Sequence, residues 1–119
     1  MPMNLKADVS RACREAGMGK PVDLVHLSTL TMGDRELEQQ VLSIFLSQSE
    51  IYAKSWKNSD GHEGRKRAAH SLKGAARGIG AWELADLAGE AELPGYSGFD
   101  AVEREIARVN DYIRSLIVH

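Results

Sequence analysis

Apolar residues recur along most of the chain at spacings of three and four, which is the period of a helix that buries one face. The most regular run lies near the C-terminal end. Its apolar positions are Phe99, Val102, Ile106, Val109, Ile113 and Leu116. A repeat of 3, 4, 3, 4 and 3 residues is typical of the seam of a helix bundle. We therefore predict a helix over about residues 99–116, with Ser97 and Asp100 as candidate caps.

A second amphipathic helix is predicted in the middle of the chain. Its apolar stripe consists of Ala69, Leu72, Ala76 and Ile79. Before the stripe, Asp60 and Glu63 have the spacing of a capping box, so the helix is expected to begin there. After the stripe, Gly80 can take the left-handed conformation that ends many helices.

The longest predicted helix runs from the break at Gly33-Asp34 to about Asn58. It spans more than twenty residues, or roughly 30 Å at 1.5 Å per residue. We expect its apolar stripe to consist of Leu37, Val41, Ile44, Phe45, Ile51, Tyr52 and Trp56.

Two shorter helices complete the pattern. One carries Trp82, Leu84, Leu87, Ala88 and Ala91 and is stopped by Pro94-Gly95. The other follows Asp23, a plausible N-cap, and places three leucines on one face: Leu24, Leu27 and Leu30.

These elements predict an all-α protein. Four amphipathic helices joined by short loops bury their apolar stripes most simply as an up-and-down antiparallel four-helix bundle, with the short extra helix near the N-terminus capping or flanking it. Residues 21–119 are expected to form this domain. Residues 1–20 are an N-terminal arm, either a short helix or disordered.

Composition narrows the functional classes. A chain of 119 residues fits one domain, and its net charge of −2 argues against nucleic-acid binding. The single cysteine excludes an intramolecular disulfide, and no apolar run is long enough to cross a bilayer. No Glu-x-x-His pairs for a bundle metal site occur, so no metal is expected. We expect a cytoplasmic protein that binds neither membrane nor nucleic acid.

The helix around residue 70 has a second, polar face. It carries His70, Lys73, Gly74 and Arg77, with Lys66 one turn before the histidine. A glycine inside a helix costs about 1 kcal/mol relative to alanine, so Gly74 suggests a partner that must come close to His70. Ser71 lies about 100° away from His70 on the helix and cannot form a serine–histidine pair with it.

This face is the one place where chemistry is plausible. The sequence contains no phosphate-binding loop of the G-x-x-x-x-G-K-[ST] type, and Gly78-Ile79-Gly80 lacks the strand–turn–helix context of a dinucleotide site. The imidazole of His70 could act as a nucleophile toward a phosphoryl group. Lys66, Lys73 and Arg77 would then stabilise the negative charge of that group.

The same residues match a known family. Ala69-His70-Ser71-Leu72-Lys73-Gly74, followed by Ile79-Gly80-Ala81 and Leu84, resembles the signature of histidine phosphotransfer (Hpt) domains. Asp23-Leu24 with Leu27, and Gly33-Asp34 with Phe45, are similar to the family's first two helices. The resemblance covers about residues 21–117.

The resemblance implies a four-helix bundle that relays a phosphoryl group between aspartates of receiver domains, without kinase or phosphatase activity of its own. His70 would be the phosphoacceptor, Lys73 the residue that stabilises its charge, and Gly74 the small residue that admits the receiver. Arg77, Lys66 and Ser71 are the further candidates for partner contact. No cofactor is implied, because magnesium belongs to the receiver.

The partners implied are response-regulator receiver domains and a hybrid sensor histidine kinase, and we expect a monomer. One alternative stays open at this point. The chain could be a phosphorylation-independent helical adaptor that binds receiver or kinase domains through the same face. Such an adaptor would have no need to combine His70 with Lys73 and Gly74.

Overall fold

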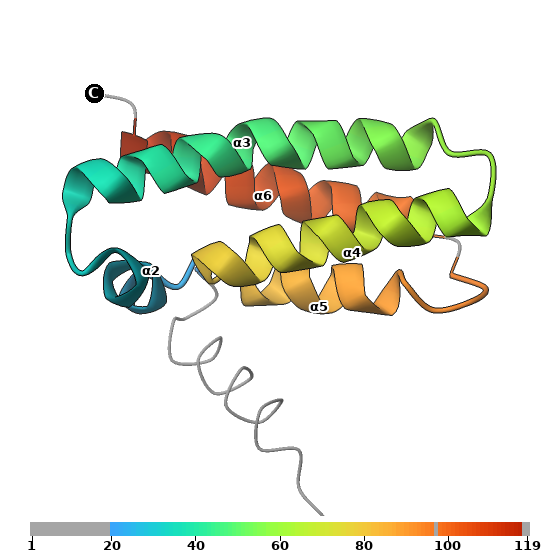
Figure 1. Ribbon diagram of the computed structural model, residues 1–119, viewed down its shortest axis with the longest axis horizontal. Helices are drawn as coiled ribbons and strands as arrows, with labels where there is room; N and C mark the ends of the chain where they lie inside the picture. The colour runs from blue at the N-terminus through green and yellow to red at the C-terminus, as the bar shows by residue number, and fades with distance from the viewer. Residues whose placement is uncertain (1–19, 97, 118–119) are drawn as a thin grey trace, which may run out of the picture.

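A computed structural model describes residues 20–96 and 98–117 of the chain (Figure 1). Within these residues the structure is helical and contains no strand. The elements are α2 (Leu24–Thr31), α3 (Arg35–Lys57), α4 (His62–Ile79), α5 (Trp82–Glu90) and α6 (Phe99–Ile117). The last four run alternately up and down, and α2 lies across one end of them (Figure 1). The predicted four-helix bundle with a short extra helix is confirmed.

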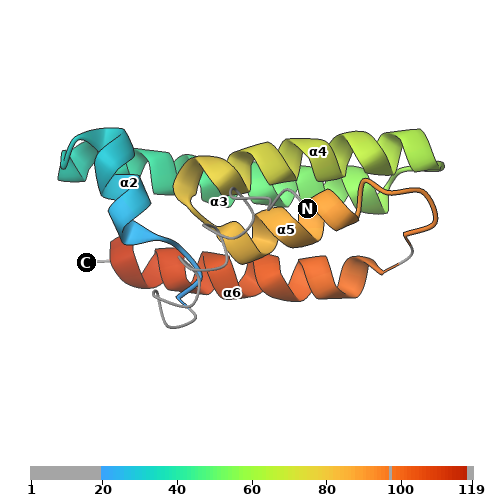
Figure 2. The same ribbon diagram turned by 90° about the horizontal axis from the view of Figure 1, so that it is seen from below.

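The order of the helices around the bundle is α3, α4, α5, α6. Helix α3 packs against α4 and α6, and α5 also packs against α4 and α6. Helices α4 and α6 occupy opposite corners, and no Cα atoms of the two helices come within 8 Å of each other in the described residues. Figure 2 shows α5 lying between α4 and α6 when the bundle is seen from below.

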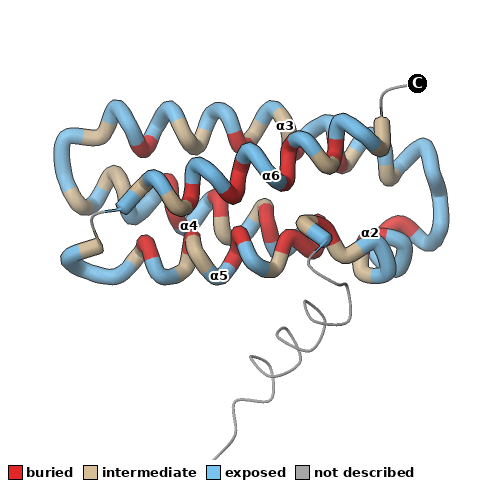
Figure 3. Tube along the Cα trace, turned by 180° about the vertical axis from the view of Figure 1, so that it is seen from behind, coloured by how far each residue is buried: buried red, intermediate tan, exposed pale blue. Residues whose placement is uncertain are grey.

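The stripes predicted for α4 and α6 supply a large part of the core, which also contains buried residues of α2, α3 and α5. On α4, all four predicted residues are buried: Ala69, Leu72, Ala76 and Ile79. On α6, the buried members are Val102, Ile106, Val109 and Ile113. Buried positions lie along the inner side of each helix and exposed positions along its outer side (Figure 3). Several of the buried residues on α4 and α5 are alanines: Ala68, Ala69, Ala76, Ala85 and Ala88.

The apolar stripe predicted for α3 is partly wrong. Phe45 and Trp56 are buried as expected, but Leu37, Ile44 and Ile51 are exposed. The buried face of α3 is instead formed by Leu42, Phe45, Ser49 and Trp56. Apolar residues cover a wider arc of α3 than its neighbours can bury, and Ile44 lies about 100° around the helix from Phe45.

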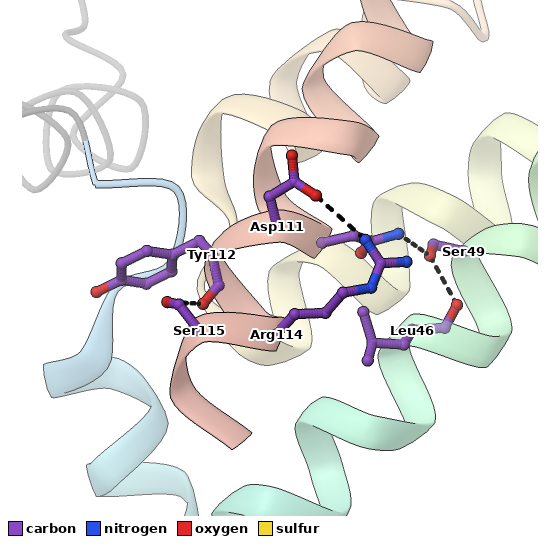
Figure 4. A network of polar contacts seen from close by, with 7 residues as sticks. Leu46, Ser49, Asp111, Tyr112, Arg114 and Ser115 are labelled. Carbon is purple, nitrogen blue, oxygen red and sulfur yellow. Dashed lines mark hydrogen bonds and ion pairs between the residues drawn. The ribbon is translucent and has the colours of Figure 1, made fainter. Parts of the chain in front are cut away.

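Two buried polar side chains join α3 to α6. The amide of Asn110 donates to the Ser49 hydroxyl at 2.9 Å. That hydroxyl in turn donates to the carbonyl of Leu46, one turn before it (Figure 4). The bond from Asn110 to Ser49 can form in only one alignment of the two helices, although the other side-chain atom of Asn110, Oδ1, is buried without a partner among the described residues. The pair therefore favours the native register of α3 against α6.

Helix α2 is fastened to the bundle through Asp23, which forms its N-cap as predicted. One carboxylate oxygen accepts from the backbone N–H groups of Val25 and His26, and the other accepts from the indole of Trp82 at 3.0 Å. Burial raises the pKa of Asp23, but these hydrogen bonds, the Trp82 bond foremost, outweigh it and lower the pKa below its ordinary value. The backbone N–H of Asp23 also donates to the carbonyl of Gly80.

Gly80 has to be glycine for two reasons at this junction. Its φ of +79° lies in the left-handed region, as expected for the residue that ends α4. A Cβ at this position would also stand 3.0 Å from the Cβ of Asp23 and 3.1 Å from its carbonyl oxygen.

The start of α4 differs from the prediction. Its N-cap is Gly61, with no side-chain hydrogen bond, so the predicted capping box of Asp60 and Glu63 is not formed. Glu63 instead supplies a negative charge in the first turn, which is favourable at a helix N-terminus. The predicted cap at Ser97 and nearly all of the arm assigned to residues 1–20 lie outside the described residues.

Candidate functional site

The burial pattern of α4 points His70 toward solvent. Its neighbours Ala69 and Leu72 are buried against the bundle, while the His70 side chain keeps 70% of its surface exposed. The imidazole is therefore open to solvent, which suits a reaction with another macromolecule.

Glu92 holds the imidazole from the side. Nδ1 of His70 lies 2.8 Å from Oε1 of Glu92, although 22 residues separate the two along the chain. Glu92 follows the end of α5, in a turn closed by hydrogen bonds from its own N–H to the Gly89 carbonyl and from the Leu93 N–H to the Glu90 carbonyl. The contact thus joins two adjacent elements of the bundle.

Lys73 completes the cluster. Its ammonium lies 2.5 Å from Oε2 of Glu92, so the two carboxylate oxygens serve Lys73 and His70 separately. The side chain of Lys73 is 21% exposed and that of Glu92 15%. The aliphatic part of Lys73 passes over Gly89, where a Cβ would stand 3.4 Å from its Cδ. Lys73 therefore points toward α5 and is held there.

The charge state of Glu92 determines which nitrogen of His70 carries the hydrogen. Burial raises the pKa of Glu92, but hydrogen bonds from Lys73 and then His70, with their charges, outweigh it and lower the pKa. An ionised carboxylate can only accept hydrogen bonds. Nδ1 must therefore carry the hydrogen, and in the neutral ring the lone pair lies on the exposed Nε2.

The other side of His70 carries small residues. Helical geometry places Ser71, Gly74 and Gly78 on the flank of α4 that faces away from Glu92 and toward α3. A Cβ at Gly74 or at Gly78 would meet nothing within 4 Å. No contact among the described residues therefore requires glycine at position 74.

An apolar surface borders this flank. Ser49 and Lys57 of α3 contact α6, through Asn110 and Glu103. Helical periodicity then places an exposed stripe of three apolar residues on the opposite flank of α3, beside α4: Leu37, Ile44 and Ile51. All three are exposed. We use the term docking surface for this stripe together with Ser71, Gly74 and Gly78.

The other two predicted cations do not join the cluster of His70, Lys73 and Glu92. Lys66 and Arg77 are exposed, and neither forms an ion pair in the part of the chain that the structure describes. Of the predicted site residues, the structure thus joins only His70 and Lys73, and it does so through Glu92.

Sequence reasoning missed Glu92, although a signal for it exists. Helices α4 and α5 are antiparallel and are joined at Gly80-Ala81. His70 lies ten residues before that turn and Glu92 eleven residues after it. Residues at similar distances from a tight helical turn lie side by side, so counting outward from the turn would have paired them.

Two features are absent from the described residues. No group of three or more His, Cys, Asp or Glu side chains in them could hold a metal ion. None of their helices combines the length and apolar character that a membrane span requires.

A family model described as Hpt domain matches residues 35–113. The matched segment contains α3, α4, α5 and most of α6, and with them His70, Lys73 and Glu92. No match was found among curated proteins or among solved structures.

Proposed function

Because the chain belongs to the Hpt domain family, we propose that it is a phosphorelay intermediate whose phosphoacceptor is His70. It takes a phosphoryl group from the aspartate of one receiver domain and passes the group to the aspartate of another response regulator. The observation that supports this proposal most is the bond between Nδ1 of His70 and Glu92, which leaves Nε2 as the exposed nucleophile.

The transfer balances in atoms and charge. The lone pair of Nε2 forms a bond to phosphorus while the bond between phosphorus and the aspartate oxygen breaks, and the receiver keeps a carboxylate. Nδ1 retains its hydrogen, so the ring becomes an imidazolium as the N–P bond forms. The Glu92 carboxylate lies 2.8 Å from that nitrogen and stabilises the new positive charge. The reverse sequence delivers the phosphoryl group to the next receiver.

The partner of this reaction is a receiver domain that reaches His70 over the docking surface. Gly74, one turn after His70, leaves room for the loops around the receiver's aspartate. The exposed stripe of Leu37, Ile44 and Ile51 offers apolar contact at one side of the histidine. Exposed cations near His70 complement the acidic side chains that hold magnesium in the receiver.

The test is transfer of radiolabelled phosphate from phosphorylated receiver domains of the same source. The wild-type protein should acquire acid-labile, base-stable label, and the His70→Gln variant should acquire none. His62→Gln is the matched control, because it removes a histidine from the same helix eight residues before His70. It should label like the wild type.

Two outcomes contradict the proposal. One is the absence of label from every receiver. The other is undiminished label on His70→Gln. Receiver binding and signalling output that survive in His70→Gln unchanged would instead favour an adaptor that works without phosphorylation.

A further inference from the structure

Lys73 is engaged in a way that the sequence does not show. Its ammonium is bonded to Glu92 at 2.5 Å, and its side chain is largely covered where it crosses Gly89. The same carboxylate is bonded to Nδ1 of His70, so the ammonium of Lys73 is held on the Nδ1 side of the imidazole. The positive charge of Lys73 is also already neutralised by the negative charge of Glu92. Lys73 is therefore a poor candidate for the cation that holds the phosphoryl oxygens.

Two other cations are better placed. Lys66 and Arg67 precede His70 by four and three residues, the spacings at which side chains on a helix are neighbours. Side chains on an α-helix lean toward its N-terminus, so the His70 ring extends over the turn that carries these two residues. Viewed down the axis of α4, Lys66 lies about 40° to one side of His70 and Arg67 about 60° to the other, at 100° per residue.

Both residues are available. Each is exposed, and no ion pair involves either of them among residues 20–96 and 98–117. The carboxylate nearest to His70 is Glu92, which is already shared between Lys73 and His70. Glu63 lies one turn before both cations on α4, but it forms no ion pair with either of them among the described residues.

We infer that Lys66 and Arg67 are the pair that binds the phosphoryl oxygens on Nε2 of His70, and that Lys73 is a positioning residue that acts through Glu92. The inference rests on the proposed function, since it needs His70 to be the phosphoacceptor. A phosphoryl group carries up to two negative charges and three acceptor oxygens. One ammonium and one guanidinium that form no ion pair within the described part of the chain match that demand.

The experiment measures the first-order transfer rate from a phosphorylated receiver at saturating concentrations of Lys66→Gln, Arg67→Gln and the double variant. We expect roughly fivefold slower transfer for each single variant and more than tenfold for the double variant, with a weaker effect at high salt. Arg104→Gln is the matched control. It removes one exposed cation from α6, which occupies the corner opposite α4, and should leave the rate unchanged.

A double-mutant cycle tests the role of Lys73. If Lys73 acts only through Glu92, Lys73→Gln should slow transfer in the wild type but add little in a Glu92→Gln background. Lys66→Gln should slow transfer by a similar factor in both backgrounds.

The outcomes separate this inference from the proposed function. A wild type that accepts no label, or label that persists in His70→Gln, overturns the proposed function and this inference with it. A wild type labelled on His70 overturns the inference alone in either of two cases. One is that Lys66→Gln and Arg67→Gln change only the half-saturating concentration and not the saturated rate. The other is that Lys73→Gln retains its full effect beside Glu92→Gln.

Discussion

The substitution Glu92→Gln isolates the charge that the structure places beside His70. Glutamine has almost the same shape as glutamate and keeps a carbonyl oxygen that can accept from Nδ1. It lacks the negative charge that would stabilise the imidazolium formed during transfer. It also gives up the ion pair with Lys73, which is one of the two contacts that fix the side chain.

The size of the effect follows from the geometry. The positive charge of the ring and the Glu92 carboxylate would be about 4 Å apart, where two unit charges attract by about 1 kcal/mol in water and about 4 kcal/mol near a protein surface. His70 is 70% exposed and Glu92 15% exposed, so solvent screens the pair strongly and the lower part of this range applies. A loss of about 1–2 kcal/mol slows transfer by about 5- to 30-fold.

The assay is a single-turnover transfer from a phosphorylated receiver at saturating concentration. Glu90→Gln is the matched control, because it removes an exposed carboxylate two residues before Glu92 without touching His70 or Lys73 in the structure. Its rate should equal that of the wild type. Equal rates for Glu92→Gln and the wild type would refute the role assigned to Glu92.

The same structure leads to four further predictions. Gly74→Gln should slow transfer at least tenfold, because the receiver needs the space beside His70. The melting temperature should not fall, because the new Cβ meets open space and glutamine is a better helix former than glycine. An unchanged transfer rate would remove the reason given for this glycine. Ile44→Ser should raise the dissociation constant for the receiver several-fold, as measured by calorimetry, since the side chain is exposed on the docking surface. Its stability, as measured by urea unfolding, should be unchanged. Unchanged affinity would exclude Ile44 from the interface. Asp23→Ala should lower the free energy of unfolding by about 2 kcal/mol, because it removes the cap of α2 and the bond to Trp82. The pKa values of Asp23 and Glu92 are lowered in the folded state, so both ionised groups stabilise the fold fully above the ordinary carboxyl pKa of about 4. This stability is lost as the pH falls through their folded-state pKa values. Acid titrations monitored by circular dichroism should therefore show a smaller loss of stability in Asp23→Ala than in the wild type.

Much of the fold could be predicted from spacing alone. The stripe of α4 is buried as expected, and so are the four central residues of the α6 stripe, while Phe99 and Leu116 at its ends are partly buried. The cap at Asp23 and the helix end at Gly80 are also formed as predicted. In these places local preference and tertiary packing agree, since a narrow stripe leaves only one way to bury a helix. The buried face of α3 was predicted wrongly in part, because apolar residues cover a wide arc of this helix. Whether Phe45 or Ile44 is buried depends on where α4 and α6 lie.

In the candidate site, too, features within one helix could be predicted and features that depend on packing between helices could not. His70 and its neighbours could be recognised because a helix fixes which residues share a face. Glu92 could not be recognised from periodicity, because its contact with His70 depends on how α5 aligns with α4. The direction of Lys73 also depended on that alignment. Sequence alone places Lys73 beside His70 but does not reveal that its ammonium is bonded to a carboxylate from the next element.

The most direct test of the central claim is nitrogen NMR of the phosphorylated protein labelled with nitrogen-15 in its histidines. The claim is that His70 reacts through Nε2 while Nδ1 keeps its hydrogen and its bond to Glu92. The account predicts phosphorus coupling to Nε2 of His70 alone, with a hydrogen retained on Nδ1. A phosphoryl group on Nδ1 of His70, or on another histidine, would contradict it.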